Sequence, residues 1–583
     1  MGKGSSIGEA YALSMRSTLA ALTIMMALLA SSIVNSASFA QTRSEPRIVL
    51  LSVDGLRRDL LDTFVARGDL PNIAKMTEQG STGVLVGVYP TNAYASQASM
   101  ATGVYPKTHG ILGSEYHATG TPLGSRTPSV NSTSILAPAE PFWAIAEKAG
   151  LNATIANFPF SWPPQGNETV VNVADTSLAP SALYTTRQLL AGETGISLTD
   201  ADRTLWGYEL RDPRELVPRE AQVTVEGSNE TFFVLVVDSK LQGAYDAVYV
   251  SRSRNISDAL ALLTKNAAWT PPVQVTVRGH EGVFRLRLLE VSADGQNLTA
   301  YTTEIAAAKG FTQPNEISSA LVNQTVFPLA SPDWKALSQG WFGEDVYMET
   351  LEMAGDWYAN STVFCSTKTQ WQVFAAYFPL VGEVQKAFLG YVTEGHPRYE
   401  AGRKEAYLDR VERAYIRLDA VVGSLLPQID ENTILILASP SGSTPVDRVF
   451  YVNRWLRDHG WLSLTADGQV DWNSTKMYYS GDGQMFVNLK GREANGIVER
   501  SDYTSLVAAV SGALVTASDQ GRVPLALVAS PASMRILGLG TERAGDIALI
   551  PTSGYTSSKA QGGNETSPFA STPAYLTGEL SLY

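Results

Sequence analysis

The sequence has 583 residues, of which 44% are hydrophobic and 17% are charged. This composition excludes a chain made mainly of solvated, disordered segments, because it can bury a large core. The net charge of -13 and the pI near 5.1 disfavour nucleic acid as a partner, since an acidic surface repels phosphate backbones.

Residues 1–40 are predicted to form an export signal. An uncharged apolar run, Leu19–Val34, precedes Ser38-Phe39-Ala40, a small-x-small pattern that suits cleavage before Gln41. An uncleaved membrane anchor is the alternative, because the run approaches the length that spans a bilayer. Either interpretation places the rest of the chain outside the cytoplasm, with membrane contact only through this segment.

Asn-x-Ser/Thr triplets are frequent and indicate an exported glycoprotein. They occur at Asn131, Asn152, Asn167, Asn229, Asn255, Asn297, Asn323, Asn360, Asn473 and Asn564. Cys365 is the only cysteine, so no internal disulfide can form.

The region from residue 41 to 204 alternates between predicted strands and helices. Arg47–Val53 is an apolar run typical of a buried parallel strand, and Leu70-Pro71-Asn72 begins a helix that ends at Gly80. A helix is expected at Phe142–Lys148 and a strand at Ala153–Ala156. This alternation predicts an α/β fold, with a doubly wound, mainly parallel sheet flanked by helices.

A β-rich insertion is expected over residues 205–312, where helices give way to apolar runs. Three of these runs are predicted to form strands: Phe232–Val237, Val273–Val277 and Val283–Leu289. The second part of the α/β core, residues 313–583, begins with helices at Glu344–Tyr358 and Arg403–Leu426. A buried strand at Thr433–Ala438 then ends at Ser439-Pro440-Ser441-Gly442.

Ligands of open α/β sheets bind outside the carboxyl ends of the strands. Asp54-Gly55 and Ser439-Pro440-Ser441-Gly442 both follow such ends, and the segment Tyr89–Ile111 lies between them in sequence. Further motifs occur in a fixed order: Leu70-Pro71-Asn72, Thr102-Gly103-Val104-Tyr105-Pro106, His109-Gly110-Ile111, Asn157–Pro164, His396-Pro397-Arg398-Tyr399 and Tyr451–Leu456. Together they resemble the type I phosphodiesterase and nucleotide pyrophosphatase family of the alkaline phosphatase superfamily.

This resemblance implies an alkaline-phosphatase-like fold with two metal ions, usually zinc. In the family, one ion is held by a strand-end Asp, the nucleophilic Thr, and the Asp and His of a Ser-Asp-His-Gly motif. The other ion takes an Asp and a His four residues apart, and a third His near the C-terminus. The two cations orient an alkoxide nucleophile and neutralise the charge that develops on phosphorus.

The sequence departs from this pattern at almost every position. Asp54 is the only matching ligand, and Ala93 stands at the nucleophile position. The other ligand positions read Gly382, Lys386, Pro440, Ser441 and Glu565. One carboxylate cannot supply the three or four donors that zinc needs. No cofactor is therefore expected.

Two side chains at the former ligand positions carry opposite charges. If the C-terminal turn is aligned correctly, Lys386 and Glu565 would form an ion pair in the emptied site. Asp54 is either a residual metal or substrate group or a residue that caps the following turn. The hydroxyls near Ala93 and the histidines His109 and His396 are interpreted as structural.

Two hypotheses of function follow. The first is a catalytically inactive, secreted or cell-surface glycoprotein that binds an unidentified protein or glycan or serves a structural role. The alternative is an active hydrolase of phosphodiester or pyrophosphate bonds that would carry two zinc ions.

Overall fold

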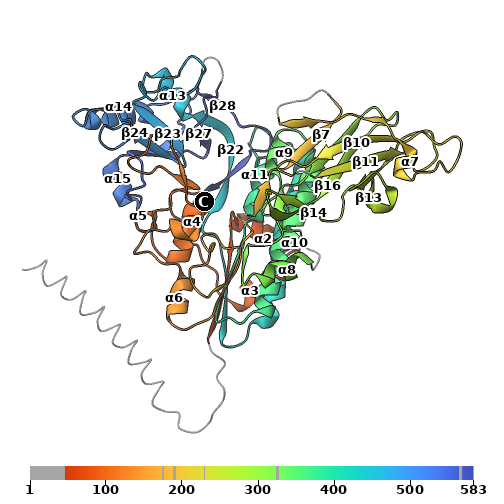
Figure 1. Cartoon of the computed structure of the whole chain (residues 1–583). Coiled ribbons are helices and arrows are strands. Elements are labelled where there is room, and N and C mark those ends of the chain that lie inside the picture. Colours follow the sequence, from red (N-terminus) through yellow and green to blue (C-terminus); the bar gives the residue numbers. More distant parts are fainter. Residues whose placement is uncertain are drawn as a thin grey trace, which may run out of the picture. The chain divides into compact units, whose positions relative to one another are not determined.

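The computed structural model describes residues 46–173, 176–187, 192–228, 230–323, 327–563 and 567–581 (Figure 1). The expected export signal, Asn229, Asn564 and Glu565 lie outside the described residues, so the predicted Lys386–Glu565 ion pair does too. Within the described part, no helix is long and apolar enough to cross a membrane.

A six-stranded sheet forms the centre of the α/β core. Its order is β19-β5-β4-β20-β1-β21, with bounds Thr312–Gln313, Thr169–Val171, Ala153–Ala156, Val373–Phe378, Arg47–Val53 and Thr433–Ala438. All neighbours are parallel except the edge pair β19 and β5. The predicted strands Arg47–Val53, Ala153–Ala156 and Thr433–Ala438 are therefore confirmed, but Thr433–Ala438 is an edge strand in which only Thr433 is buried, not the buried strand that was expected.

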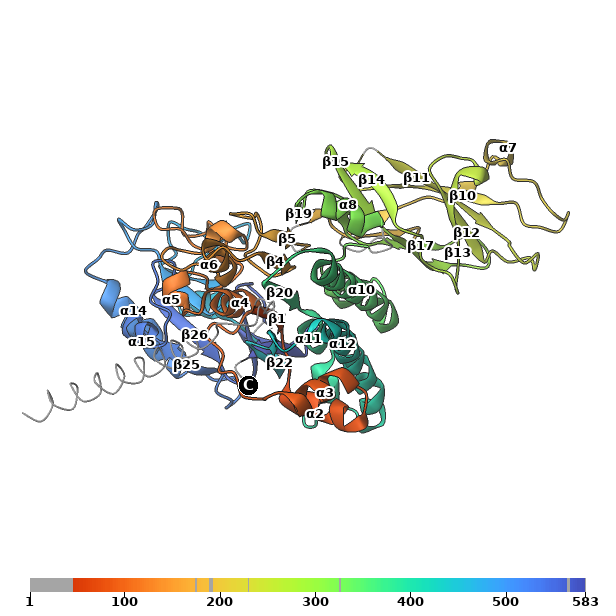
Figure 2. The ribbon, with the colours of Figure 1, turned by 90° about the horizontal axis from the view of Figure 1, so that it is seen from below.

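Helices cover both faces of this sheet, which confirms the doubly wound fold. Figure 2 shows α4 (Ala93–Thr102) and α6 (Phe142–Lys148) on one side of β1, β20 and β4. On the other side lie α10 (Glu344–Lys368), α11 (Leu380–Val392) and α12 (Lys404–Leu425). Alternate side chains of β20 enter the two cores: Phe374 and Phe378 on the α10 side, Tyr377 on the α4 side.

Mainly antiparallel sheets make up the β-rich insertion, with a hydrophobic core of their own. Their strands begin with β6 (Ser177–Ala179), before the expected boundary at residue 205, and end with β18 (Ile305–Ala307). The longest ladder joins β10 (Arg219–Thr224), β11 (Thr231–Val237), β12 (Ala247–Ser251) and β13 (Ala259–Thr264).

The single strand expected at Val283–Leu289 is wrong, because the chain changes sheets at Arg285. β15 (His280–Phe284) pairs with β14 (Val273–Val277) and β18, whereas β16 (Leu286–Val291) pairs with β17 (Leu298–Thr302). The backbone N–H of Arg285 instead donates a hydrogen bond to the Thr303 hydroxyl, and the backbone carbonyl of Arg285 accepts one from the N–H of Thr303. Hydrophobic periodicity does not reveal this change, because both strands are apolar.

The C-terminal part of the chain adds further sheets beyond the central one. β22 (Gly442–Tyr451) leaves the end of β21 and pairs with β29 (Gly578–Ser581), β27 (Gly554–Ser558) and β28 (Phe569–Ser571). A second sheet has the order β23-β24-β26-β25, with bounds Met477–Gly481, Gln484–Val487, Ile547–Pro551 and Leu525–Ala529. α14 (Tyr503–Val515) packs on β25.

The predicted glycosylation sites differ in exposure. Asn152, Asn167, Asn360 and Asn473 are exposed, and Asn131, Asn255 and Asn297 are half-buried. The side chain of Asn323 lies outside the described part.

Candidate functional site

Asp54 lies at the carboxyl edge of the central sheet and is held by two side-chain donors. It follows β1 directly, and only 3% of the residue is exposed. Gln97 of α4 donates to Oδ1 at 2.8 Å, and the hydroxyl of Tyr377, at the end of β20, donates to Oδ2. The Ser52 hydroxyl in turn donates to Oε1 of Gln97 at 2.8 Å. A chain of protein hydrogen bonds therefore engages both carboxyl oxygens.

Burial raises the pKa of Asp54 and the pKa of Tyr377. It raises the pKa of Asp54 from 3.8 to about 6, against the hydrogen bonds from Tyr377 and Gln97, which lower the pKa. The charge of Glu383 adds a smaller upward contribution to the pKa of Asp54. Burial and the neighbouring Asp54 raise the pKa of Tyr377 well above 10.0, so its hydroxyl remains a donor at neutral pH.

The turn after Asp54 brings α11 against the sheet. Gly55 has φ +72°, and a Cβ there would lie 2.7 Å from Oγ of Ser443 and 2.9 Å from Cα of Gly382. A Cβ at Gly382 would in turn lie 3.3 Å from Cβ of Asp54. Position 382 thus directly adjoins Asp54, as the resemblance implies, but glycine has no side chain to bind a metal.

Ala93 begins α4, one residue after Asn92. The Asn92 side chain caps the helix by accepting from the backbone N–H of Ala95 at 2.9 Å. The first helical side chain is consequently a methyl group. It has no oxygen to attack phosphorus.

Ser99, farther along α4, meets His109 at the end of α5 (Pro106–His109), with 2.9 Å between Ser99 Oγ and His109 Nε2. The backbone N–H of Ile111 donates to Nδ1 of His109 at 3.1 Å, so the ring proton sits on Nε2 and points at Ser99. Burial also lowers the pKa of His109 to about 4. An imidazole that donates to the hydroxyl cannot remove its proton, so Ser99 is not activated as a nucleophile.

Lys386 lies on α11, and its ammonium is 4.3 Å from the ring centroid of Trp334. Its charge also lowers the pKa of Glu579, although burial raises that pKa more strongly, to about 7. Sequence reasoning missed both Trp334 and Glu579, because neither belongs to a motif.

Pro440 and Ser441 occupy the turn after β21. The carbonyl of Ser441 accepts from the N–H of Gly55 at 3.2 Å, which ties this turn to Asp54. The Ser441 hydroxyl is buried and has no hydrogen-bond partner in the described part of the chain. A serine hydroxyl and a proline thus stand where the resemblance implies an imidazole and a carboxylate.

Sequence comparison decides the family. The profile of the family described as type I phosphodiesterase / nucleotide pyrophosphatase matches residues 48–233 and 263–576. The chain belongs to this family. Members of it with local similarity include human ectonucleotide pyrophosphatase/phosphodiesterase family member 1, 32% identical over 132 residues, and venom phosphodiesterase 2 of Crotalus adamanteus, 30% identical over 130 residues.

These local matches are short. They cover 22% and 21% of this chain but only 13% and 15% of the two relatives. Among solved structures, phosphonoacetate hydrolase from Sinorhizobium meliloti has a TM-score of 0.43 at 11% identity, covering 88% of this chain and 83% of that one.

The residues around Asp54 do not fit the two zinc ions that the resemblance implies. Zinc prefers imidazole, thiolate and carboxylate donors in tetrahedral array. Within the described residues, no group of three or more His, Cys, Asp or Glu side chains could hold a metal ion. Three of the histidines are engaged elsewhere: His117 with Glu493, His396 with the carbonyl of Val446 and His459 with that of Trp455.

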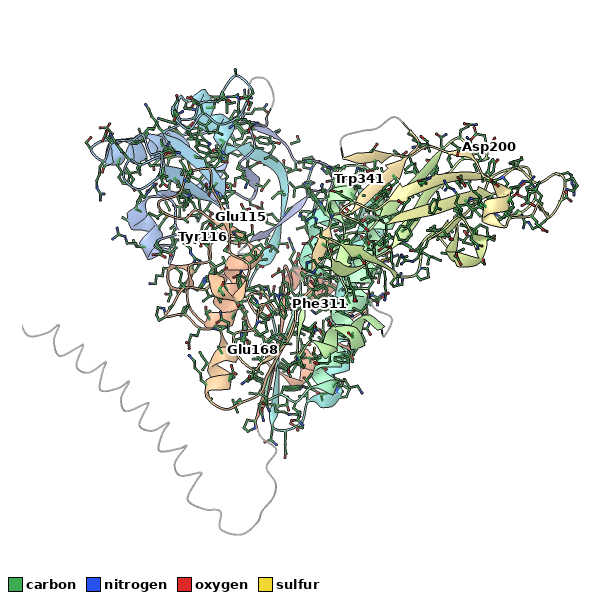
Figure 3. The ribbon with its side chains drawn as sticks, in the orientation of Figure 1. Glu115, Tyr116, Glu168, Asp200, Phe311 and Trp341 are labelled. Atoms are coloured by element: carbon green, nitrogen blue, oxygen red, sulfur yellow. The ribbon has the colours of Figure 1, made fainter. Side chains whose placement is uncertain are left out.

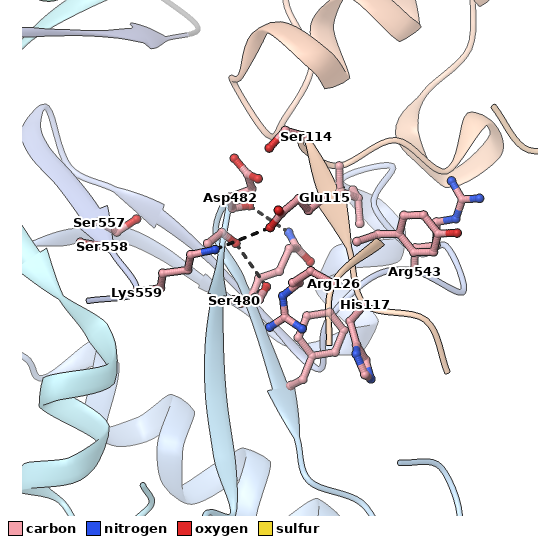
Figure 4. Close-up of a pocket in the computed structure, with 15 residues that line it drawn as sticks. Ser114, Glu115, His117, Arg126, Ser480, Asp482, Arg543, Ser557, Ser558 and Lys559 are labelled. Carbon is pink, nitrogen blue, oxygen red and sulfur yellow. Dashed lines mark hydrogen bonds and ion pairs between the residues drawn. The ribbon is translucent and has the colours of Figure 1, made fainter. Parts of the chain in front are cut away.

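A cavity of about 290 Å³ lies next to the start of α4 (Figure 4). Asn92 donates to the carbonyl of Leu112 at 2.8 Å and contacts Asp482 at 3.4 Å, and both partners line the cavity. Across it, Lys559 forms an ion pair with Glu115 at 3.6 Å. Burial raises the pKa of Asp482 to about 6. The cavity therefore carries charges of both signs, and no single ligand charge is favoured.

Proposed function

We propose that this family member is a glycoprotein of the cell exterior that does not hydrolyse phosphodiester bonds. The observation that carries the proposal is the set of side chains around Asp54. Gln97 and Tyr377 donate to its oxygens, and Gly382, which directly adjoins it, offers no donor. Ala93 stands at the nucleophile position.

Each missing group removes a separate requirement of the reaction. Without an alkoxide or other activated oxygen at position 93, no covalent bond to phosphorus can form there. Without cations, the negative charge that develops on the phosphoryl oxygens in the transition state is not stabilised. Lys386 could supply one positive charge, but its ammonium rests on the Trp334 ring. A binding or structural role requires none of these groups.

An active hydrolase is the second candidate. It is favoured by the family match and by similar proteins that are named phosphodiesterases. It would need a nucleophile other than residue 93 and metal ligands that include residues outside the described part.

The test is to measure bound metal and hydrolysis on the glycosylated protein secreted from eukaryotic cells. Metal content is read by inductively coupled plasma mass spectrometry, and hydrolysis of bis(4-nitrophenyl) phosphate is followed with and without added zinc. We expect no stoichiometric zinc and no turnover.

The variant Asp54→Asn, purified in parallel, is the control for contaminating enzymes. Turnover that is equal in both preparations belongs to a contaminant. Stoichiometric zinc with turnover that a chelator abolishes, and that Asp54→Asn lacks, would overturn the proposal and establish the hydrolase.

A further inference from the structure

A second and larger cavity, of about 540 Å³, lies beside α6. Its walls come from the loop that precedes α6, from α6 itself and from the turn at residues 165–168. Trp143 and Phe160, both almost completely buried, contribute aromatic surface, and Ile135 and Pro138 contribute aliphatic surface. None of the residues that contact Asp54 lines this cavity. It is thus a separate site, of a size that suits a small organic ligand.

Two carboxylates in this cavity hold the turn at 165–168 with one oxygen each. Oε1 of Glu147 accepts from the backbone N–H of Asn167 at 2.6 Å. Oε1 of Glu168 accepts from the backbone N–H of Gln165 at 3.0 Å. Both side chains line the cavity. Figure 3 labels Glu168, whose turn is attached to α6 through the Glu147 bond.

The second oxygen of Glu168 is left without a partner. Glu168 is 5% exposed, and its Oε2 is buried with no hydrogen bond in the described part of the chain. Neither Glu147 nor Glu168 takes part in an ion pair there. The cavity's lysine, Lys148, is already paired with Glu140. A buried carboxylate oxygen without a partner costs free energy, and such groups in folded proteins normally contact a donor or a cation.

The charge and shape of the cavity define its ligand. Glu147 and Glu168 supply negative charge that no described cation neutralises, so a positively charged ligand is favoured. The aromatic and aliphatic walls require an apolar body behind that charge, and aromatic rings themselves attract cations. A guanidinium or ammonium group also supplies the N–H donors that Oε2 of Glu168 lacks.

We propose that this cavity binds a small organic cation, a guanidinium or primary ammonium group on an apolar body, with Glu168 as its charge partner. The site does not depend on whether the chain hydrolyses phosphodiesters. Asn131 and Asn167, two predicted glycosylation sites, flank residues that line the cavity, so binding is measured with and without enzymatic removal of glycans.

The test compares two ligands of the same shape by isothermal titration calorimetry. Phenethylguanidinium carries the charge, and phenethylurea replaces one nitrogen with a neutral oxygen. We expect the intact protein to bind the guanidinium at least about tenfold more tightly than the urea, equivalent to about 1.4 kcal/mol. In Glu168→Gln this preference should fall below about twofold.

The matched control is the double variant Glu140→Gln and Lys148→Gln, which removes an ion pair from the cavity lining without changing the net charge of the cavity. It should retain the tenfold preference. Glu168→Gln keeps an oxygen that can accept from the N–H of Gln165, so its thermal unfolding midpoint should not fall. A normal midpoint excludes misfolding as the cause of a lost ligand preference. Equal binding of both ligands, binding of neither, or an unchanged preference in Glu168→Gln would each overturn the proposal.

Discussion

Replacing Asp54 by Asn should change how stability depends on pH. The pKa of Asp54 is raised from 3.8 to about 6 in the folded chain, chiefly by burial. Folding therefore favours the protonated carboxyl, whose stabilising contribution is complete below pH 3.8 and is lost as the pH rises through about 6. The shift of about two pKa units corresponds to roughly 3 kcal/mol.

The assay is urea unfolding of the wild type and Asp54→Asn in pairs at several pH values. Because the variant lacks this titration, the wild type should lose up to roughly 3 kcal/mol relative to it between about pH 4 and pH 7. Asp62→Asn is the control, since Asp62 is a surface carboxylate paired with Arg58. Its difference from the wild type should stay nearly constant.

The opposite trend would refute this reasoning. If the wild type gains stability over Asp54→Asn as the pH rises, the ionised carboxylate is the favoured form in the folded chain. A cation near Asp54 would produce that result. The experiment therefore tests for a bound metal without measuring activity.

Three further substitutions have defined outcomes in urea unfolding. Tyr377→Phe removes the hydroxyl that donates to Asp54 and should cost about 1–3 kcal/mol at neutral pH, and an unchanged stability would contradict this bond. Asp419→Ala removes the buried carboxylate that accepts from Asn72 and Ile73 in the first turn of α3 (Pro71–Gln79), so it should lower the free energy of unfolding by about 1–3 kcal/mol. The surface control Asp409→Ala should lower it by less than about 0.5 kcal/mol. Lys386→Met removes the cation above an indole ring and should cost about 0.5–2 kcal/mol; no loss would mean that the contact is not stabilising.

The sequence predicted the strands of the central sheet well because they are continuous apolar runs. Arg47–Val53 lies inside the sheet, and even the edge strand Thr433–Ala438, in which only Thr433 is buried, could be bounded from its apolar composition. The insertion was harder. There the strand break at Arg285 depends on hydrogen bonds to Thr303, a partner distant in sequence.

The side chains that donate to Asp54 could not be predicted from the sequence. Motif spacing placed Ala93 and Gly382 at family positions, but no motif indicated that Gln97 and Tyr377 would bind Asp54. A signal for Tyr377 existed, because it lies near the carboxyl end of a strand that pairs with β1 in parallel. The pairing of β20 with β1, however, is information that only the fold supplies.

The two proposed properties of this chain depend on opposite uses of a buried carboxylate. Asp54 is surrounded by donors, so it is satisfied without a ligand. Glu168 has one oxygen satisfied by its own turn and one buried without a partner. Both oxygens of Asp54 already accept hydrogen bonds, so an incoming N–H donor would supply a missing hydrogen bond only at Glu168. A protein can in this way lose the chemistry of its family and still bind a ligand elsewhere in the same fold.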